Sequence, residues 1–341
     1  MNRNTRAAHK ALLKAWTPRK AKNALRILLS YYLSRWRRIP MMMGFPFSVS
    51  IEPTTSCNLR CPECPSGLRS FSRPTGMLSP DLFNAFLNQT EGHLVYLNFY
   101  FQGEPFLHPT FLDLVEGSVK RSIFTSTSTN AHYLNVKTAE RVVDSGLHRL
   151  IISLDGASQD VYAAYRKGGQ VEKVLEGIKN VAEARKRKGK LNPEIVVQNL
   201  LVKPNIHEKQ QVELLAKSLG ADRVVFKTAQ VYDLKADHYL VPDEPEFSRY
   251  KKTEGGGLEI KNPLLNQCWR MWSGCVITWD GKVVPCCFDK DASHQMGTLQ
   301  EAPFVKIWQS ESYQNFRRAI LSSRSEIDIC KNCTEGTKVW A

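Results

Sequence analysis

The chain has 341 residues, of which 42% are hydrophobic and 23% charged, so it can bury a large core and is neither disordered nor fibrous. Its formal net charge is +14, but the first 40 residues carry eleven Lys and Arg side chains and no acidic one. The remaining body is close to neutral, which argues against a nucleic-acid-binding surface spread over the fold. Nine cysteines in spaced groups favour metal ligation in a reducing compartment over a disulfide framework.

Residues 1–40 are predicted to form a basic amphipathic leader. The apolar run "LRILLSYYL" at 25–33 is too short to span a bilayer and precedes no small-residue cleavage site, so we expect a cytoplasmic protein. Apolar and aromatic residues are mixed with arginines at 26–38, a pattern that suits a helix on the anionic inner face of the membrane. A solvated basic tail and an RNA-binding arm are the alternatives.

From about residue 47 the sequence alternates between strand-like and helix-like runs. The predicted strands are 47–52, 93–101, 122–129, 148–154, 194–202 and 222–228, and the predicted helices are 80–90, 109–120, 136–145, 158–188 and 206–219. Such alternation predicts parallel βαβ units with right-handed crossovers. An open six-stranded relative of the (β/α) barrel fits better than a doubly wound sheet. The expected fold class is therefore α/β, with a partial (β/α)6 TIM-like barrel over residues 41–240.

A stretch rich in Pro, Gly and charged residues, 241–264, is predicted to be a linker. The six late cysteines all lie beyond it, so residues 265–341 are expected to form a small metal-binding domain.

Three cysteines follow the first predicted strand in the segment "CNLRCPEC" (57–64). Each iron of an iron-sulfur cluster takes four ligands, so a 4Fe-4S cubane held by Cys57, Cys61 and Cys64 would keep one iron open. The CxxxCxxC loop resembles that of the radical S-adenosylmethionine (radical SAM) superfamily. In that superfamily the methionine moiety of the cosubstrate chelates the open iron. A structural zinc or three unrelated buried thiols are the alternatives.

Other motifs lie at strand ends, where barrels of this type build their sites. "QGEP" (102–105) is similar to the family's GGEP motif, which implies that Gly103 and Glu104 bind the amino group of S-adenosylmethionine. "ISLDG" (152–156) implies a cosubstrate contact by Ser153. "YRKGG" (165–169) implies that Arg166 pairs with the methionine carboxylate, which suits a planar guanidinium. "STN" (128–130) looks like the family's strand-end TN motif.

The late cysteines resemble those of the auxiliary-cluster domain called SPASM, or its shortened twitch form. The resemblance implies one auxiliary iron-sulfur cluster, expected to be 4Fe-4S. Its ligand set is Cys268, Cys286, Cys330 and Cys333, with Cys287 as the alternative to its neighbour. Cys275 does not fit the SPASM spacing. A four-cysteine zinc ribbon is the competing interpretation, because spacing alone does not select the metal.

The resemblance implies an oxidoreductase of the radical SAM class. An electron from a flavodoxin- or ferredoxin-type donor would cleave S-adenosylmethionine, and the 5'-deoxyadenosyl radical would abstract hydrogen from a substrate in the barrel. The sequence assigns no catalytic base.

The expected substrate is a small molecule such as a sugar or cyclitol alcohol. The late cysteines are similar to those of a radical dehydrogenase family that acts on an aminoglycoside precursor. Forty residues are also too few for the leader-recognition domain of many peptide-modifying members. Maturation of a peptide or protein is the alternative. A non-catalytic zinc or iron-sulfur protein with a nucleic-acid-binding arm is the rival from another class, although nucleic acid is not the expected partner.

Overall fold

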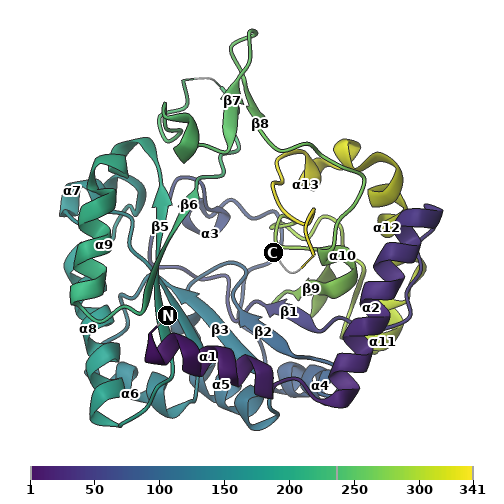
Figure 1. Ribbon diagram of the computed structural model, residues 1–341, viewed down its shortest axis with the longest axis horizontal. Coiled ribbons are helices and arrows are strands. Elements are labelled where there is room, and N and C mark those ends of the chain that lie inside the picture. Colours follow the sequence, from purple (N-terminus) through teal and green to yellow (C-terminus); the bar gives the residue numbers. More distant parts are fainter. Residues whose placement is uncertain (1, 236, 340–341) are drawn as a thin grey trace.

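The structure is a computed structural model, and it describes residues 2–235 and 237–339. At its centre six parallel strands alternate with helices, as the sequence predicts (Figure 1). The strands are β1 (Ser48–Ile51), β2 (Tyr96–Phe99), β3 (Phe124–Thr129), β4 (Arg149–Ser153), β5 (Glu194–Leu201) and β6 (Arg223–Thr228). The helices that cross between them are α4 (Pro80–Thr90), α5 (Phe111–Lys120), α6 (Val136–Asp144), α7 (Gln159–Tyr165), α8 (Val171–Arg187) and α9 (Lys209–Ser218). Short helices α3 (Pro65–Leu68), η1 (Pro105–Leu107) and η2 (Lys203–Glu208) lie in the loops.

The six strands follow one another in chain order across the sheet, each parallel to the next. This arrangement confirms the predicted partial (β/α)6 barrel. The longer helical region predicted at 158–188 consists of two helices, α7 and α8. The chain breaks at Gly168, which has a φ of +82° that glycine adopts at no steric cost.

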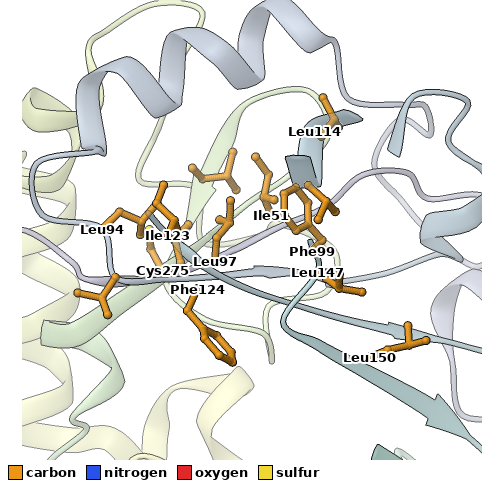
Figure 2. Close-up of a cluster of buried hydrophobic side chains, with 14 of the residues drawn as sticks. Ile51, Leu94, Leu97, Phe99, Leu114, Ile123, Phe124, Leu147, Leu150 and Cys275 are labelled. Atoms are coloured by element: carbon orange, nitrogen blue, oxygen red, sulfur yellow. The ribbon is translucent and has the colours of Figure 1, made fainter. Parts of the chain in front are cut away.

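Apolar side chains from the strands and from the surrounding helices form one continuous core (Figure 2). Ile51, Leu97 and Phe99 come from β1 and β2, while Leu114 comes from α5, and all four are at most 4% exposed. The core continues into the C-terminal region, because Cys275 belongs to the same cluster.

The C-terminal region extends the barrel sheet instead of forming a sheet of its own. Its strands are β9 (Gly274–Ile277), β10 (Lys282–Val284) and β11 (Gly297–Thr298). β9 pairs in parallel with β1, in the register Ser48 to Gly274, so the sheet has nine strands. The helices of this region are α10 (Arg270–Ser273), α11 (Phe304–Trp308), α12 (Glu311–Ser323), η4 (Arg324–Glu326) and α13 (Asp328–Lys331).

The proposed linker, 241–264, contains a short helix and an antiparallel hairpin. The helix is η3 (Pro245–Phe247), and the strands are β7 (Tyr250–Lys252) and β8 (Leu258–Ile260). The hairpin projects beyond the barrel in Figure 1.

The basic leader forms two helices, α1 (Arg3–Lys14) and α2 (Pro18–Arg37), each capped by the side chain of the preceding residue. α1 is attached to the barrel where Asn4 Nδ2 donates a hydrogen bond to Asp222 Oδ1 over 2.7 Å. α2 packs on the C-terminal region through Tyr31, which is fully buried beside Trp269 and Trp272. The leader is therefore part of the folded body.

Within residues 2–235 and 237–339, no helix is both long enough and apolar enough to cross a membrane.

We expect Tyr31→Ala to lower the free energy of unfolding by about 3–5 kcal/mol, because it removes a buried ring that packs on two tryptophans. Leu25→Ala, on the exposed face of the same helix, is the matched control and should change stability by less than about 0.5 kcal/mol. Denaturant unfolding followed by circular dichroism measures both variants. Equal stability of the two variants would show that α2 does not support the fold.

Candidate active site

The first cysteine set lies in the loop that follows β1, at the carboxyl end of the barrel strands. Cys61 is buried, while Cys57 and Cys64 are half-buried. The pKa of Cys57 is raised to about 12, mainly by burial, with smaller contributions from Glu104 and from the neighbouring Cys61 and Cys64 thiols. The structure thus brings the three predicted ligands together, in surroundings where thiolates require cationic partners.

The loop after β2 lies against this cysteine loop. The Glu104 N–H donates to the Ser56 carbonyl over 2.7 Å, and the Gly103 N–H donates to Ser66 Oγ over 2.8 Å. Gly103 has a φ of +74°, and a Cβ there would lie 2.2 Å from the Thr54 carbonyl oxygen. Only glycine fits this approach of the two loops.

The Glu104 carboxylate is buried on the inner side of the barrel. It accepts hydrogen bonds from Thr129 Oγ1 over 2.7 Å and from the Asn130 N–H over 2.8 Å. Burial nevertheless raises the pKa of Glu104 to about 7, with these hydrogen bonds opposing the shift. An ammonium group beside the carboxylate would stabilise its charged form, so this site fits the amino group that the resemblance assigns to it.

Asn130 is a site residue absent from the sequence-based ligand set. Besides its contact with Glu104, its Nδ2 donates to Asn58 Oδ1 over 2.8 Å and lies 4.0 Å from Cys57 Sγ. It therefore links the third strand to the cysteine loop. The available signal was the STN motif, which ends at this residue.

Arg166 lies at the carboxyl end of α7, where the chain breaks before α8. Its Nε is 2.5 Å from Asp155 Oδ2, and its Nη1 is 3.8 Å from Cys61 Sγ. The arginine is therefore next to the cysteine set, but the structure pairs it with Asp155, which the sequence-based set omits. Ser153 is buried two residues earlier, at the end of β4.

The second cysteine set surrounds a buried arginine. Cys268, Cys330 and Cys333 are all buried, and Arg324 Nη2 lies 3.4 Å from Cys333 Sγ. Burial raises the pKa of Cys330 to about 12, and the Cys268 thiol beside it acts in the same direction. Arg324 itself is 1% exposed and has no motif that marks it in the sequence. The positive charge of Arg324 would stabilise the neighbouring cysteines in their thiolate form.

The remaining late cysteines fall into two environments. Burial raises the pKa of Cys286 well above its usual value, and the thiols of Cys287 and Cys268 contribute. Cys287 also interacts electrostatically with Cys333, so both adjacent cysteines stay candidates for the fourth ligand. Cys275 instead lies on β9, where burial raises its pKa to about 12 and Tyr313 lies nearby.

In the part of the chain that the structure describes, no three His, Cys, Asp or Glu side chains converge tightly enough to hold a single metal ion. The sets are instead defined by neighbouring thiols, each with an arginine beside it. These residues fit two anionic clusters with thiolate ligands.

Tyr100 has neighbours in both cysteine sets. It directly follows β2, and its electrostatic neighbours include Cys64 of the first set and Cys287 of the second. Protein surrounds it closely enough that desolvation raises the pKa of Tyr100, yet 46% of its surface is accessible. Lys290 is close by, with its Nζ 5.1 Å from the ring centre of Tyr232. These three side chains were not identified from the sequence.

Comparison with known proteins agrees with this geometry. A profile of the radical SAM superfamily matches residues 51–216, and a SPASM profile, described as an iron-sulfur cluster-binding domain, matches residues 268–334. The chain therefore belongs to the radical SAM superfamily and carries a C-terminal SPASM domain, as the cysteine spacings predict. Its cofactors are 4Fe-4S clusters and S-adenosylmethionine.

Two characterised relatives are similar over most of their length. One is the tungsten-containing aldehyde ferredoxin oxidoreductase cofactor-modifying protein of Pyrococcus furiosus, 27% identical over 83% of this chain and 86% of the relative. The other is the mycofactocin maturase MftC of Mycobacterium tuberculosis, 28% identical over 78% of this chain and 71% of the relative.

Two solved structures share the fold. SuiB of Streptococcus suis, bound to S-adenosylmethionine, has a TM-score of 0.61 and 15% identity over 86% of this chain and 73% of its own. BtrN, in complex with AdoMet and 2-DOIA, has a TM-score of 0.54 and 19% identity over 86% of this chain and 95% of its own. At these identities the likeness concerns the fold alone.

We expect the affinity for S-adenosylmethionine to decrease as the pH falls through about 7, because the buried Glu104 carboxylate then becomes protonated and loses its charge. Below that pKa the decrease should approach about tenfold per pH unit. Glu104→Gln should bind about tenfold to a hundredfold more weakly at high pH, since a charge-assisted hydrogen bond contributes about 1.5–3 kcal/mol. Anaerobic equilibrium dialysis gives both profiles. A pH dependence that persists in Glu104→Gln would assign the titration to another group.

Proposed function

We propose that this radical SAM enzyme modifies a peptide or protein by hydrogen abstraction. The observation that carries the proposal is the exposure of Tyr100, which has electrostatic neighbours in both cysteine sets and 46% of its surface accessible. Solvent therefore reaches Tyr100, and a substrate in contact with Tyr100 would be near both sets. An accessible reaction site suits a chain segment that enters and leaves while the rest of the substrate stays outside.

The side chains around this place suit a polypeptide. Tyr232 is 50% exposed, and Lys290 lies over its ring. Aromatic surfaces with a hydroxyl and an ammonium group nearby can pack on peptide side chains and bond to backbone carbonyls.

The loop that carries Lys290 is firmly attached to the barrel. Arg73 Nε donates to the Lys290 carbonyl over 3.0 Å, and the Ser72 N–H donates to Asp291 Oδ1 over 2.9 Å. These bonds tie the loop after Cys287 to residues 72 and 73, so a substrate bound at Tyr100 would also meet Lys290.

The relatives support the same choice. The mycofactocin maturase is similar over most of both chains, whereas the likeness to BtrN is one of fold. Oxidation of a sugar or cyclitol alcohol remains a prediction from the cysteine spacing.

The chain's residues have separable roles in this proposal. When bound, the first cluster supplies the electron that cleaves S-adenosylmethionine, and the 5'-deoxyadenosyl radical abstracts hydrogen. Glu104 and Gly103 hold the amino end of the cosubstrate. Ser153 at the end of β4 and Arg166 at the end of α7 orient it. Cys268, Cys330 and Cys333, with Cys286 or Cys287, would hold a fully ligated cluster, which could supply an acceptor for the second electron of a net oxidation.

The source of electrons and the compartment follow from the same chemistry. A flavodoxin- or ferredoxin-type protein is the proposed donor, since the first cluster must be reduced in each turnover. We place the enzyme in the cytoplasm, where reducing conditions keep cysteines available for cluster assembly.

Anaerobically reconstituted protein with a strong reductant should convert S-adenosylmethionine to 5'-deoxyadenosine, and Cys57→Ala should reduce the rate to background. Cys275→Ala is the matched control. This buried cysteine lies near Tyr313 and belongs to neither set of predicted ligands. The variant should retain cleavage within about twofold. Chromatographic quantification of 5'-deoxyadenosine measures all three proteins. Full activity of Cys57→Ala would refute the assignment of the first set.

The substrate class can be tested with two probe pools, one of short synthetic peptides and one of cyclitols and amino sugars. We expect 5'-deoxyadenosine formation to rise above the uncoupled rate only with peptides, together with a mass change in a peptide. Lys290→Ala should remove this stimulation while keeping uncoupled cleavage, because it lies on the substrate side of the site. Stimulation by a cyclitol alone would favour alcohol oxidation instead.

A further inference from the structure

Helix α2 presents an apolar stripe to solvent. Leu25, Leu29, Tyr32 and Trp36 follow one another at intervals of four, three and four residues, so they share one face of the helix. Their exposed fractions are 65%, 51%, 50% and 77%. A contiguous row of large exposed apolar side chains is unusual on a protein surface and indicates a binding surface. We call these four residues the α2 stripe.

The opposite face of the helix fixes the direction of the stripe. Ile27 and Tyr31 are fully buried, and Tyr31 makes edge contacts with Trp269 and Trp272. The helix runs along an outer edge of the molecule (Figure 1). It therefore cannot turn its stripe inward without losing this packing.

Basic side chains flank the stripe. By helical position, Lys22, Arg26 and Arg37 lie on one side of it, and Arg35 lies on the other. Arg37 lies over the Trp36 ring at 5.7 Å, and the first 40 residues contain no acidic side chain. The surface is thus apolar along its middle and positive along both sides.

A shallow groove of about 870 Å³ continues this surface beyond the end of the helix. Tyr32, Trp36, Arg35 and Arg38 line it on the α2 side, and Leu265, which is 49% exposed, lines it on the other. Apolar and cationic groups therefore meet again at the point where the helix ends.

We propose that α2 docks in the plane of an anionic phospholipid bilayer. The stripe would enter the boundary between headgroups and acyl chains, where Trp and Tyr are favoured. The flanking arginines and lysine would extend to lipid phosphates, since their long side chains can keep the charged ends at the surface. The basic residues beside the stripe favour an anionic bilayer as the binding partner, because an apolar protein partner would not require basic residues on both sides of the stripe.

Flotation of the full chain with vesicles tests the proposal. The wild type should float with phosphatidylcholine vesicles that contain phosphatidylserine, and binding should weaken with salt. Leu29→Asp/Trp36→Asp should lower the bound fraction by about tenfold or more, because it places charge in the apolar stripe. Lys22→Glu/Arg26→Glu should weaken binding to the anionic vesicles while leaving the stripe intact.

Leu214→Asp is the matched control, because Leu214 is a 62% exposed leucine on α9, outside the leader. It should float as the wild type does. Thermal unfolding by circular dichroism shows whether each variant is folded, which is expected since every substituted side chain is exposed.

Several outcomes would overturn the proposal. These are equal flotation with neutral vesicles, unchanged flotation of Leu29→Asp/Trp36→Asp, or no flotation of the wild type. Sedimentation that shows a dimer of the wild type and a monomer of that variant, without flotation, would assign the stripe to a second copy. Tight binding of an unrelated RNA without flotation would assign the basic residues to nucleic acid.

Discussion

The buried ion pair between Glu52 and Arg73 joins the parts of this enzyme that must act together. Arg73 Nη2 and Nη1 lie 2.6 and 2.9 Å from the two carboxylate oxygens of Glu52, and both side chains are at most 4% exposed. Glu52 directly follows β1, and it also accepts the Trp279 N–H from the SPASM region over 3.2 Å. Removing one partner of such a pair typically costs about 3–5 kcal/mol, because the other charge stays buried.

This pair sets the relation between the two cysteine sets. Parallel pairing of β1 with β9 brings the SPASM region against the barrel, and Arg73 then bonds to the Lys290 carbonyl in the loop after Cys287. The region is thus attached to the barrel at two places, the β1–β9 pairing and Arg73. Two separate attachments prevent it from rotating about the paired strands. The loop of Lys290, an electrostatic neighbour of Tyr100, is therefore tied to the barrel.

Sequence patterns identified what depends on local periodicity and on motif spacing. The six strands and both cysteine sets are of this kind, because alternation and ligand spacing are properties of short segments. The pairing of β9 with β1 could not be predicted in this way, since it joins segments that lie far apart in the chain. Asp155 belongs to a recognised motif, but its bond to Arg166 depends on where α7 ends.

Other features had no sequence signal at all. Arg324 and the Glu52–Arg73 pair are ordinary charged residues in the sequence, and only burial gives them a role. The leader was predicted to be basic and amphipathic from its composition alone. Its attachment through Tyr31 depends on Trp269 and Trp272, which lie far along the chain.

The two arginines beside the cysteine sets are held in different ways. Arg324 donates to the backbone carbonyls of Gln267 and Glu335, each over 2.7 Å, and backbone groups cannot leave without local unfolding. Arg166 instead pairs with the side-chain carboxylate of Asp155, at the end of a helix and before the Gly168–Gly169 turn. A guanidinium has five N–H donors, so Arg166 can keep its bond to Asp155 and still donate to the carboxylate of a ligand. The donors of Arg324 beside Cys333 are instead directed at the main chain.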